Sequence, residues 1–134
     1  MVDHANPSEE HQMLREMIRD FTQEFVEPQA HEFDKKEKFN LELFRQLGDL
    51  GLLGITVPEK YGGSGLDVVA ATIAHEELSY SDPGFALAYL AHSMLFVNNL
   101  AQNGSEEQKN RILPKVCSGE WTVSYTHLTL PTKA

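Results

Sequence analysis

Few side chains in this sequence could do acid–base, metal or nucleophilic chemistry, so their spacing is the first thing to examine. Glu76 and Glu77 are adjacent within a helical pattern. Adjacent side chains on a helix point about 100° apart. Two carboxylates that diverge in this way cannot share one acid–base site. We therefore interpret both glutamates as salt-bridge partners on a helix surface.

The histidines, Ser93 and the single cysteine show no catalytic pattern either. His75 and His92 fall on different expected helices, without cysteines or carboxylates at the spacing of a metal site. Ser93 lacks the Gly-x-Ser-x-Gly setting of an activated serine. Cys117 has Lys115 nearby but no histidine partner in the sequence. We predict no catalytic, cofactor-binding or metal-binding residue here, and interpret the histidines as polar core or surface residues.

A better candidate for a binding surface is the apolar segment of residues 84–102. Its large apolar side chains lie nearly all round a helix, which predicts burial in a protein or a bilayer. The apolar run is too short for a membrane span and contains His92, Ser93, Asn98 and Asn99, so we expect a buried core helix. We also expect it to be the most buried helix of the chain. Its large apolar residues are Phe85, Leu87, Leu90, Met94, Leu95, Phe96, Val97 and Leu100.

Four further helices are expected around this segment, which gives an all-α bundle of about five helices. Ser8, Asn40 and Asp67 are each placed to cap a helix start, and Ser105 with Gln108 forms a capping-box pattern. These caps predict where four of the five helices begin.

Prolines are expected to shape the ends of three of these helices. Pro28 should kink the first helix, with an irregular helical extension through about Phe33. Asp82 and Pro83 should stop the third helix, and Pro114 should bend or end the last one.

Residues 51–66, here called the glycine loop, hold five of the nine glycines and interrupt the helical patterns. Pro58 fixes its own φ and biases Val57 toward an extended conformation. We expect a short extended piece at residues 55–57 that leads into a glycine-rich turn. The glycine spacing does not match a phosphate-binding loop.

The composition is that of an ordinary soluble globular chain, with 41% hydrophobic and 23% charged residues among 134. The formal net charge is −9, from 20 acidic and 11 basic residues. Nucleic acid and anionic membranes need a positive surface, so neither is expected as a partner. One cysteine excludes an internal disulfide and fits a reducing compartment. The N-terminus has the pattern of neither a signal peptide nor a transit peptide.

Four segments, in order, resemble the N-terminal domain of the acyl-CoA dehydrogenase family. The first is Leu-Gly-Ile-Thr-Val-Pro-Glu-Lys-Tyr-Gly-Gly-Ser-Gly-Leu at residues 53–66. The others are Ala-His-Glu-Glu-Leu-Ser at 74–79, Gly-Ser-Glu-Glu-Gln-Lys at 104–109, and Leu-Pro-Lys at 113–115 with Ser-Gly-Glu-Trp at 118–121. The resemblance covers roughly residues 9–121. Residues 87–93, Leu-Ala-Tyr-Leu-Ala-His-Ser, resemble short- and branched-chain members of the isovaleryl-CoA dehydrogenase type.

The resemblance implies an FAD-dependent oxidoreductase of the α,β-dehydrogenation class. Such enzymes oxidise an acyl-CoA thioester to the 2,3-enoyl-CoA and pass electrons to an electron-transfer flavoprotein. In the family, the catalytic glutamate and most of the FAD site lie beyond the N-terminal helical domain, and the intact enzymes are homo-oligomers. The resemblance therefore implies an inactive fragment, located in a bacterial cytoplasm or a mitochondrial matrix.

The resemblance also implies which surface meets the substrate. In the family, the helix that corresponds to residues 84–102 lines the pocket for the acyl tail. Leu87 and Ala91 then occupy wall positions one helical turn apart, where alanine leaves room and leucine limits depth. The expected acyl-pocket residues are Leu87, Leu90, Ala91, Met94 and Leu95.

The chain is expected to divide into a flexible tail at residues 1–8, the helical domain at 9–121 and a non-family tail at 122–134. That last segment replaces the run of small and apolar residues by which the family enters its middle domain. We interpret it as a truncated or frame-disrupted end, with a genuine divergent end as the alternative. A second hypothesis for the whole chain is a non-catalytic α-helical binding or interaction module.

Overall fold

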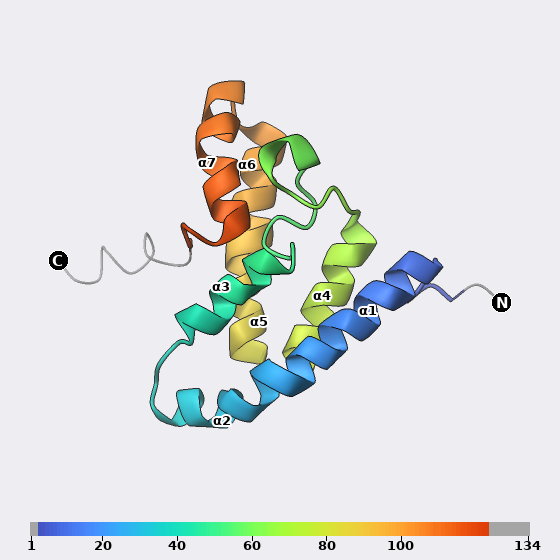
Figure 1. The fold of residues 1–134 in the computed structure, drawn as a ribbon, viewed down its shortest axis with the longest axis vertical. Helices are drawn as coiled ribbons and strands as arrows, with labels where there is room; N and C mark the ends of the chain where they lie inside the picture. The colour runs from blue at the N-terminus through green and yellow to red at the C-terminus, as the bar shows by residue number, and fades with distance from the viewer. Residues whose placement is uncertain (1–2, 124–134) are drawn as a thin grey trace.

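The computed structural model describes residues 3–123, and the part it describes is helical without a strand (Figure 1). Five continuous helices make up the bundle. Two of them, the first and the fourth, each consist of three helical segments joined end to end. This confirms the predicted all-α fold. Residues 124–134, which include most of the tail assigned as non-family, lie outside the described residues.

The first helix runs through α1 (Glu9–Phe21), a π-helical segment (Thr22–Val26) and α2 (Glu27–Lys35). Ser8 caps it as predicted, accepting a hydrogen bond from the His11 backbone N–H. The expected kink at Pro28 takes the form of the π segment, which ends two residues before the proline. A proline removes one N–H and crowds the preceding turn, and a π segment re-registers the hydrogen bonds there. The helix then continues to Lys35, two residues past the predicted end.

The second helix, α3 (Leu41–Asp49), packs its buried side into the bundle. Asn40 caps its start by accepting a hydrogen bond from the Leu43 backbone N–H, as predicted. Gly51 follows its end with φ of +76°, a conformation that favours glycine.

The glycine loop contains a 3-10 helical turn (Glu59–Tyr61) and otherwise has no regular structure. The prediction of an extended piece at residues 55–57 was wrong, because these residues form turns. The Val57 backbone N–H donates to the Gly54 carbonyl at 3.1 Å, which closes a turn in place of a strand. The apolar side chains that precede the 3-10 turn are deeply buried: Leu52, Leu53, Ile55 and Val57.

The third and fourth helices share a boundary residue. Asp82 ends α4 (Val68–Ser81), as expected, and also caps α5 (Pro83–Leu90) by accepting from the Phe85 backbone N–H. A second π segment (Ala91–Asn98) and α6 (Asn99–Asn103) continue α5 without a break. Residues 83–103 together are called the central helix below.

The central helix is less buried than the sequence predicted. Leu87 is 50% exposed and Leu95 is 57% exposed, although both belong to the apolar pattern that predicted burial on all sides. By contrast, α4 has six buried residues among its 14. The other four helices leave one side of the central helix open, so an all-round apolar sequence here marks a partly uncovered surface.

The fifth helix, α7 (Glu106–Ser118), begins at the predicted capping box of Ser105 and Gln108. Pro114 lies inside this helix and does not end it, contrary to one predicted outcome. Gly119, with φ of +87°, follows the last turn.

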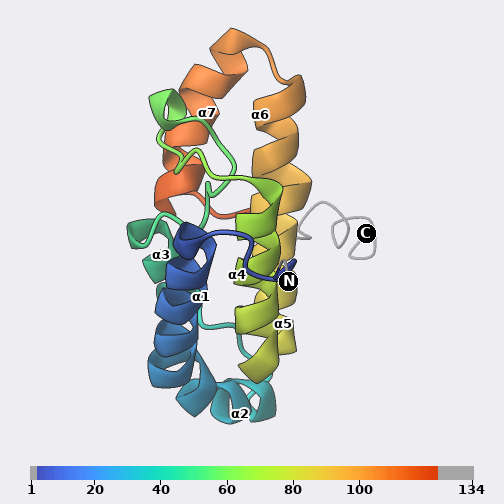
Figure 2. The same cartoon turned by 90° about the vertical axis from the view of Figure 1, so that its right-hand side faces the viewer.

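Two apolar cores hold the elements together. The larger core lies among α1, α3, α4 and α5, and α1 and α4 run side by side in both ribbon views (Figures 1 and 2). A smaller core packs the end of the glycine loop and the central helix against α7; its fully buried members are Val57, Val97, Leu113 and Val116.

The first prediction rests on the close approach of Gly63 to the backbone of Val57. A Cβ at residue 63 would lie 2.1 Å from the Val57 carbonyl oxygen, so Gly63→Ala should lower the free energy of unfolding by about 1–3 kcal/mol. Gly84→Ala is the matched control, because the nearest atom to its Cβ is 3.5 Å away. Urea unfolding followed by circular dichroism measures both. Equal midpoints for the two variants would contradict the packing described here.

Candidate functional site

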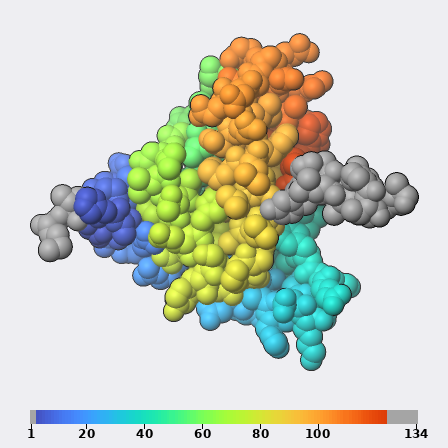
Figure 3. All heavy atoms as spheres, turned by 180° about the vertical axis from the view of Figure 1, so that it is seen from behind, coloured from blue at the N-terminus to red at the C-terminus, as the bar shows by residue number. Residues whose placement is uncertain are grey.

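The five predicted acyl-pocket residues lie on the central helix, within α5 and the π segment that follows it. Figure 3 shows this helix running along the surface beside α4. Leu87 and Leu95 are exposed, Leu90 and Met94 are half-buried, and Ala91 is 6% exposed. These five residues are called the apolar face below.

The shape of the apolar face comes from the difference in side-chain size along it. Leu87, Ala91 and Leu95 follow one another at intervals of four residues, and the small side chain stands between two exposed leucines. Met94 packs against the larger core, which anchors this part of the helix from inside. The result is an apolar surface in which a small, buried alanine separates two exposed leucines.

Two hydrogen bonds fix the central helix against the glycine loop. The buried Tyr89 hydroxyl donates to the Leu52 carbonyl at 2.6 Å, and Thr56 Oγ1 donates to Asn98 Oδ1 at 2.8 Å. Burial raises the pKa of Tyr89, so the phenol stays neutral and remains a donor. These contacts hold both halves of the helix that carries the apolar face.

His92 lies next to Ala91 and is completely buried. Its Nε2 lies 2.8 Å from the Val116 carbonyl oxygen, and its Nδ1 lies 3.0 Å from the Val123 backbone N. A carbonyl accepts and an amide donates, so the ring is the neutral tautomer with the proton on Nε2. Burial lowers the pKa of His92, although the two backbone hydrogen bonds oppose this effect. The prediction of a polar core histidine is correct for this residue.

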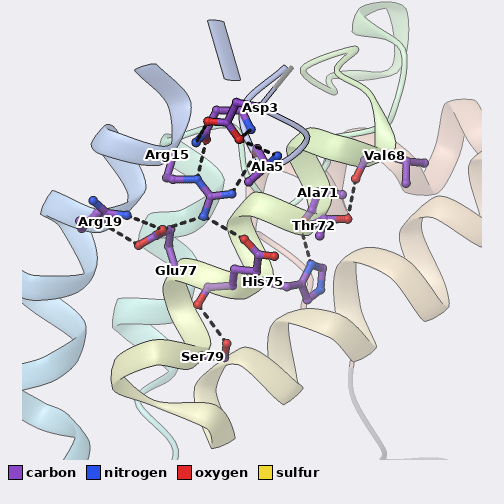
Figure 4. Close-up of polar contacts among 12 residues, drawn as sticks. Asp3, Ala5, Arg15, Arg19, Val68, Ala71, Thr72, His75, Glu77 and Ser79 are labelled. Carbon is purple, nitrogen blue, oxygen red and sulfur yellow. Dashed lines mark hydrogen bonds and ion pairs between the residues drawn. The ribbon is translucent and has the colours of Figure 1, made fainter. Parts of the chain in front are cut away.

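The adjacent glutamates are ion-pair partners as predicted, but Glu77 is buried, whereas a surface position was predicted. Arg19 donates to both Glu77 oxygens, from Nε at 3.1 Å and from Nη2 at 3.0 Å. Arg15 Nη1 lies 2.8 Å from Glu77 Oε1 and 2.9 Å from Glu76 Oε2 (Figure 4). Burial raises the pKa of Glu77, but hydrogen bonds from Arg19 and Arg15 outweigh this and place it below the ordinary value.

Arg15 also holds the segment that precedes α1. Its Nε donates to Asn6 Oδ1 at 2.7 Å, and its Nη2 donates to the Ala5 carbonyl at 3.2 Å. The sequence patterns did not single out Arg15 or Arg19, so this cluster was missed. Their spacing of four residues was the signal, because it puts two guanidinium groups on one stripe of α1.

The remaining candidates show no catalytic arrangement. Nδ1 of His75 lies 2.6 Å from the Ala71 carbonyl oxygen within α4. Cys117 is buried, and burial raises the pKa of its thiol to about 11, so it is not a thiolate at neutral pH. Within residues 3–123, no group of three or more histidine, cysteine or carboxylate side chains is placed to hold a metal ion.

The hollow of about 440 Å³ between α1 and α4 does not suit an FAD. It carries the carboxylates of Glu76 and Glu77, whereas a flavin needs an apolar slot and its pyrophosphate needs free donors. Arg19, which lines this hollow, donates from Nε and Nη2 to Glu77. The apolar face is a surface suited to contact with an aliphatic group. Among the helices described here, none combines the length and apolarity that a membrane crossing requires.

Comparison with known proteins agrees with this fold. The sequence profile of the acyl-CoA dehydrogenase N-terminal domain matches residues 8–120, and the chain belongs to this family. The isovaleryl-CoA dehydrogenase of Pongo abelii mitochondria is 47% identical over 116 residues, which is 85% of this chain and 27% of that protein. The chain therefore spans about a quarter of the length of this relative.

Solved structures show the same architecture. The butyryl-CoA dehydrogenase of Megasphaera elsdenii superposes with a TM-score of 0.80 at 33% identity, over 86% of this chain and 31% of that one. An acyl-CoA dehydrogenase from Bacillus anthracis, solved in complex with FAD, superposes with a TM-score of 0.75 at 38% identity, over 86% and 20% of the two chains.

The ion-pair cluster makes the second prediction. Glu77→Gln leaves two guanidinium groups without their shared carboxylate, so the free energy of unfolding should fall by about 3 kcal/mol at pH 7. Glu76 is more than half exposed, so Glu76→Gln is the matched control and should cost less than about 1 kcal/mol.

The same pair of variants predicts a pH dependence. A depressed folded-state pKa contributes stability above the unfolded value of about 4.3, and this stability is lost as pH falls through the folded value. The difference between the wild type and Glu77→Gln should therefore shrink below about pH 4. Urea unfolding at pH 3 to 7 tests this, and a difference that grows on acidification would rule out the assigned pairing.

Proposed function

We propose that this chain supplies the acyl-tail side of the substrate pocket in an FAD-dependent acyl-CoA dehydrogenase. The reaction is the α,β-dehydrogenation of a short or branched acyl-CoA thioester, with electrons passed to an electron-transfer flavoprotein. The observation that carries the proposal is the small, buried Ala91 between exposed Leu87 and Leu95, on the central helix of a member of this family.

The chemistry of the apolar face supports a short aliphatic ligand. Burying one methylene of an acyl tail on such a surface contributes about 0.8 kcal/mol, and no polar side chain of the face has to be desolvated. Ala91 provides room for a branch, and the flanking leucines limit the reach of the tail. Discrimination by such a surface amounts to about 1–3 kcal/mol per methylene.

The proposal assigns binding, and no chemical step, to the residues described here. The general base and the flavin site belong to parts of the longer enzyme beyond the described residues. We further propose a homo-oligomer for the intact enzyme and a bacterial cytoplasmic or mitochondrial matrix location, in line with the mitochondrial relative.

The proposal predicts a selective response of the apolar face to an acyl-CoA. Methyl and amide NMR signals of the five face residues should shift when the chain is titrated with millimolar isovaleryl-CoA. They should move much less with CoA alone, because the aliphatic tail makes the contact. Leu87→Gln should weaken the response at least about threefold, because it removes apolar contact worth about 1 kcal/mol.

Leu66→Gln provides the matched control for this titration, since Leu66 is 43% exposed and lies in the glycine loop and not on the central helix. It should leave the response unchanged. Identical shifts with CoA and isovaleryl-CoA, or shifts centred on another surface, would sink the proposal. An acyl-independent response would favour a non-catalytic interaction module.

The proposal also predicts that the 134-residue chain does not turn over acyl-CoA. Glu77, which lines the hollow between α1 and α4, is held by Arg15 and Arg19, and we assign the general base and most of the flavin site to parts of the longer enzyme. The chain is mixed with FAD, isovaleryl-CoA and a dye acceptor, and dye reduction is followed. Reduction above the buffer control, together with flavin absorbance that co-elutes with the chain, would contradict it.

A further inference from the structure

A buried histidine that no step above uses joins three elements of the domain. His92 lies in the π segment of the central helix, one residue from Ala91. Nε2 donates to the Val116 carbonyl in the last turns of α7, and Nδ1 accepts from the Val123 backbone N–H beyond that helix. Both partners are backbone groups, so the two hydrogen bonds do not depend on which side chains stand at these positions.

The bonds use the full capacity of a neutral imidazole. With one donor and one acceptor, the ring satisfies an orphan carbonyl near the end of α7 and an otherwise free amide. Val123 also packs against the smaller core, so the amide is held where the ring can reach it. The ring thereby ties the Val116 carbonyl of α7 and the Val123 amide beyond α7 to the turn of the central helix that carries the apolar face.

We propose that His92 is a positioning residue that latches the chain beyond α7 to the central helix, and that protonation of Nδ1 releases this latch. A protonated ring has two donors, so it can no longer accept from the Val123 amide. The Val116 contact survives protonation, because Nε2 is a donor in both states. The release is therefore confined to the segment beyond α7.

Among the described residues around His92 none is a charged partner, so protonation of the ring itself decides whether the latch holds. The Phe44 ring of α3 faces the imidazole edge-on at 5.5 Å. On the central helix, Tyr89 precedes His92 and is kept neutral by burial, and in α7 Cys117 follows Val116 as a neutral buried thiol. Burial and the Val116 and Val123 hydrogen bonds account for the shift in the pKa of His92, without a charged neighbour.

The role in dehydrogenation rests on the proposed function, whereas the latch rests on the hydrogen bonds alone. The His92 ring is attached both to the turn that carries the apolar face and to the chain at Val123. It therefore fixes the position of the chain at Val123 relative to the proposed acyl-tail surface. If acyl-CoA fails to perturb the apolar face but the latch behaves as described, the proposed function fails and the latch stands.

The test is NMR on the wild-type 134-residue chain, with the tautomer of His92 read from its ring nitrogen shifts. Hydrogen exchange of the Val123 amide is followed from pH 8 to pH 4 and corrected for intrinsic rates. We expect the Nε2–H tautomer at pH 7 and at least about tenfold protection of the amide. Protection should disappear at the pH where the His92 ring titrates. The Trp121 amide is the internal control, since it donates to the Lys115 carbonyl and should keep its protection.

Variants separate the latch from general stability. His92→Gln keeps one donor and one acceptor but does not titrate, so the Val123 amide should stay protected at low pH. His92→Leu should lose the protection at every pH, and His75→Gln, in α4, should behave as the wild type. An Nδ1–H tautomer at pH 7, or Val123 protection that is indifferent to protonation of His92, would overturn the proposal.

Discussion

The glycine loop, which has one 3-10 turn and no other regular secondary structure, lies inside this helical domain, and its buried backbone polar groups have to find partners there. The Gly54 carbonyl accepts from the N–H groups of both Val57 and Ser64, and the Val57 carbonyl accepts from Gly65. Gly63 makes this possible, because any side chain at that position would collide with Val57. The Leu52 carbonyl is satisfied by Tyr89, so the loop and the central helix cannot be placed independently.

The proposed function builds on this constraint. The glycine loop and the two cores hold the inner side of the central helix, and its outer side is left with exposed leucines around Ala91. An apolar helix that a small bundle cannot cover completely is the kind of surface on which an aliphatic ligand or another part of a longer enzyme packs. Membership of the acyl-CoA dehydrogenase family is the reason for proposing an acyl-CoA tail as that ligand.

Much of the fold was predictable because local chemistry marks helix ends. The predicted caps are all present, at Ser8, Asn40, Asp67 and Ser105. A short polar side chain just before an apolar helical pattern accepts a hydrogen bond from a free backbone N–H of the first turn. The family was also predictable from ordered motifs. The internal geometry of the loop was not: apolar residues from Leu52 to Val57 indicate burial, but periodicity cannot distinguish a strand from buried turns.

The site was predictable only in part, for the same reason. The sequence placed five residues on one helix, but exposure of Leu87 and Leu95 depends on what the other helices leave uncovered. The Arg15–Glu77 pairing joins residues 62 positions apart, and the bonds of His92 are to backbone groups that no sequence pattern marks. Such contacts are determined by tertiary packing, which local propensities do not encode.

The glycine loop is a structural part of the core and sets the position of the central helix. Native-state hydrogen exchange of the Val57, Ser64 and Leu66 amides tests it most directly, because these amides donate to carbonyls within the loop. We expect them to exchange with the same free energy of opening as amides in the middle of the central helix, so that both open together. Fast exchange of the loop amides while the central helix stays protected would contradict it.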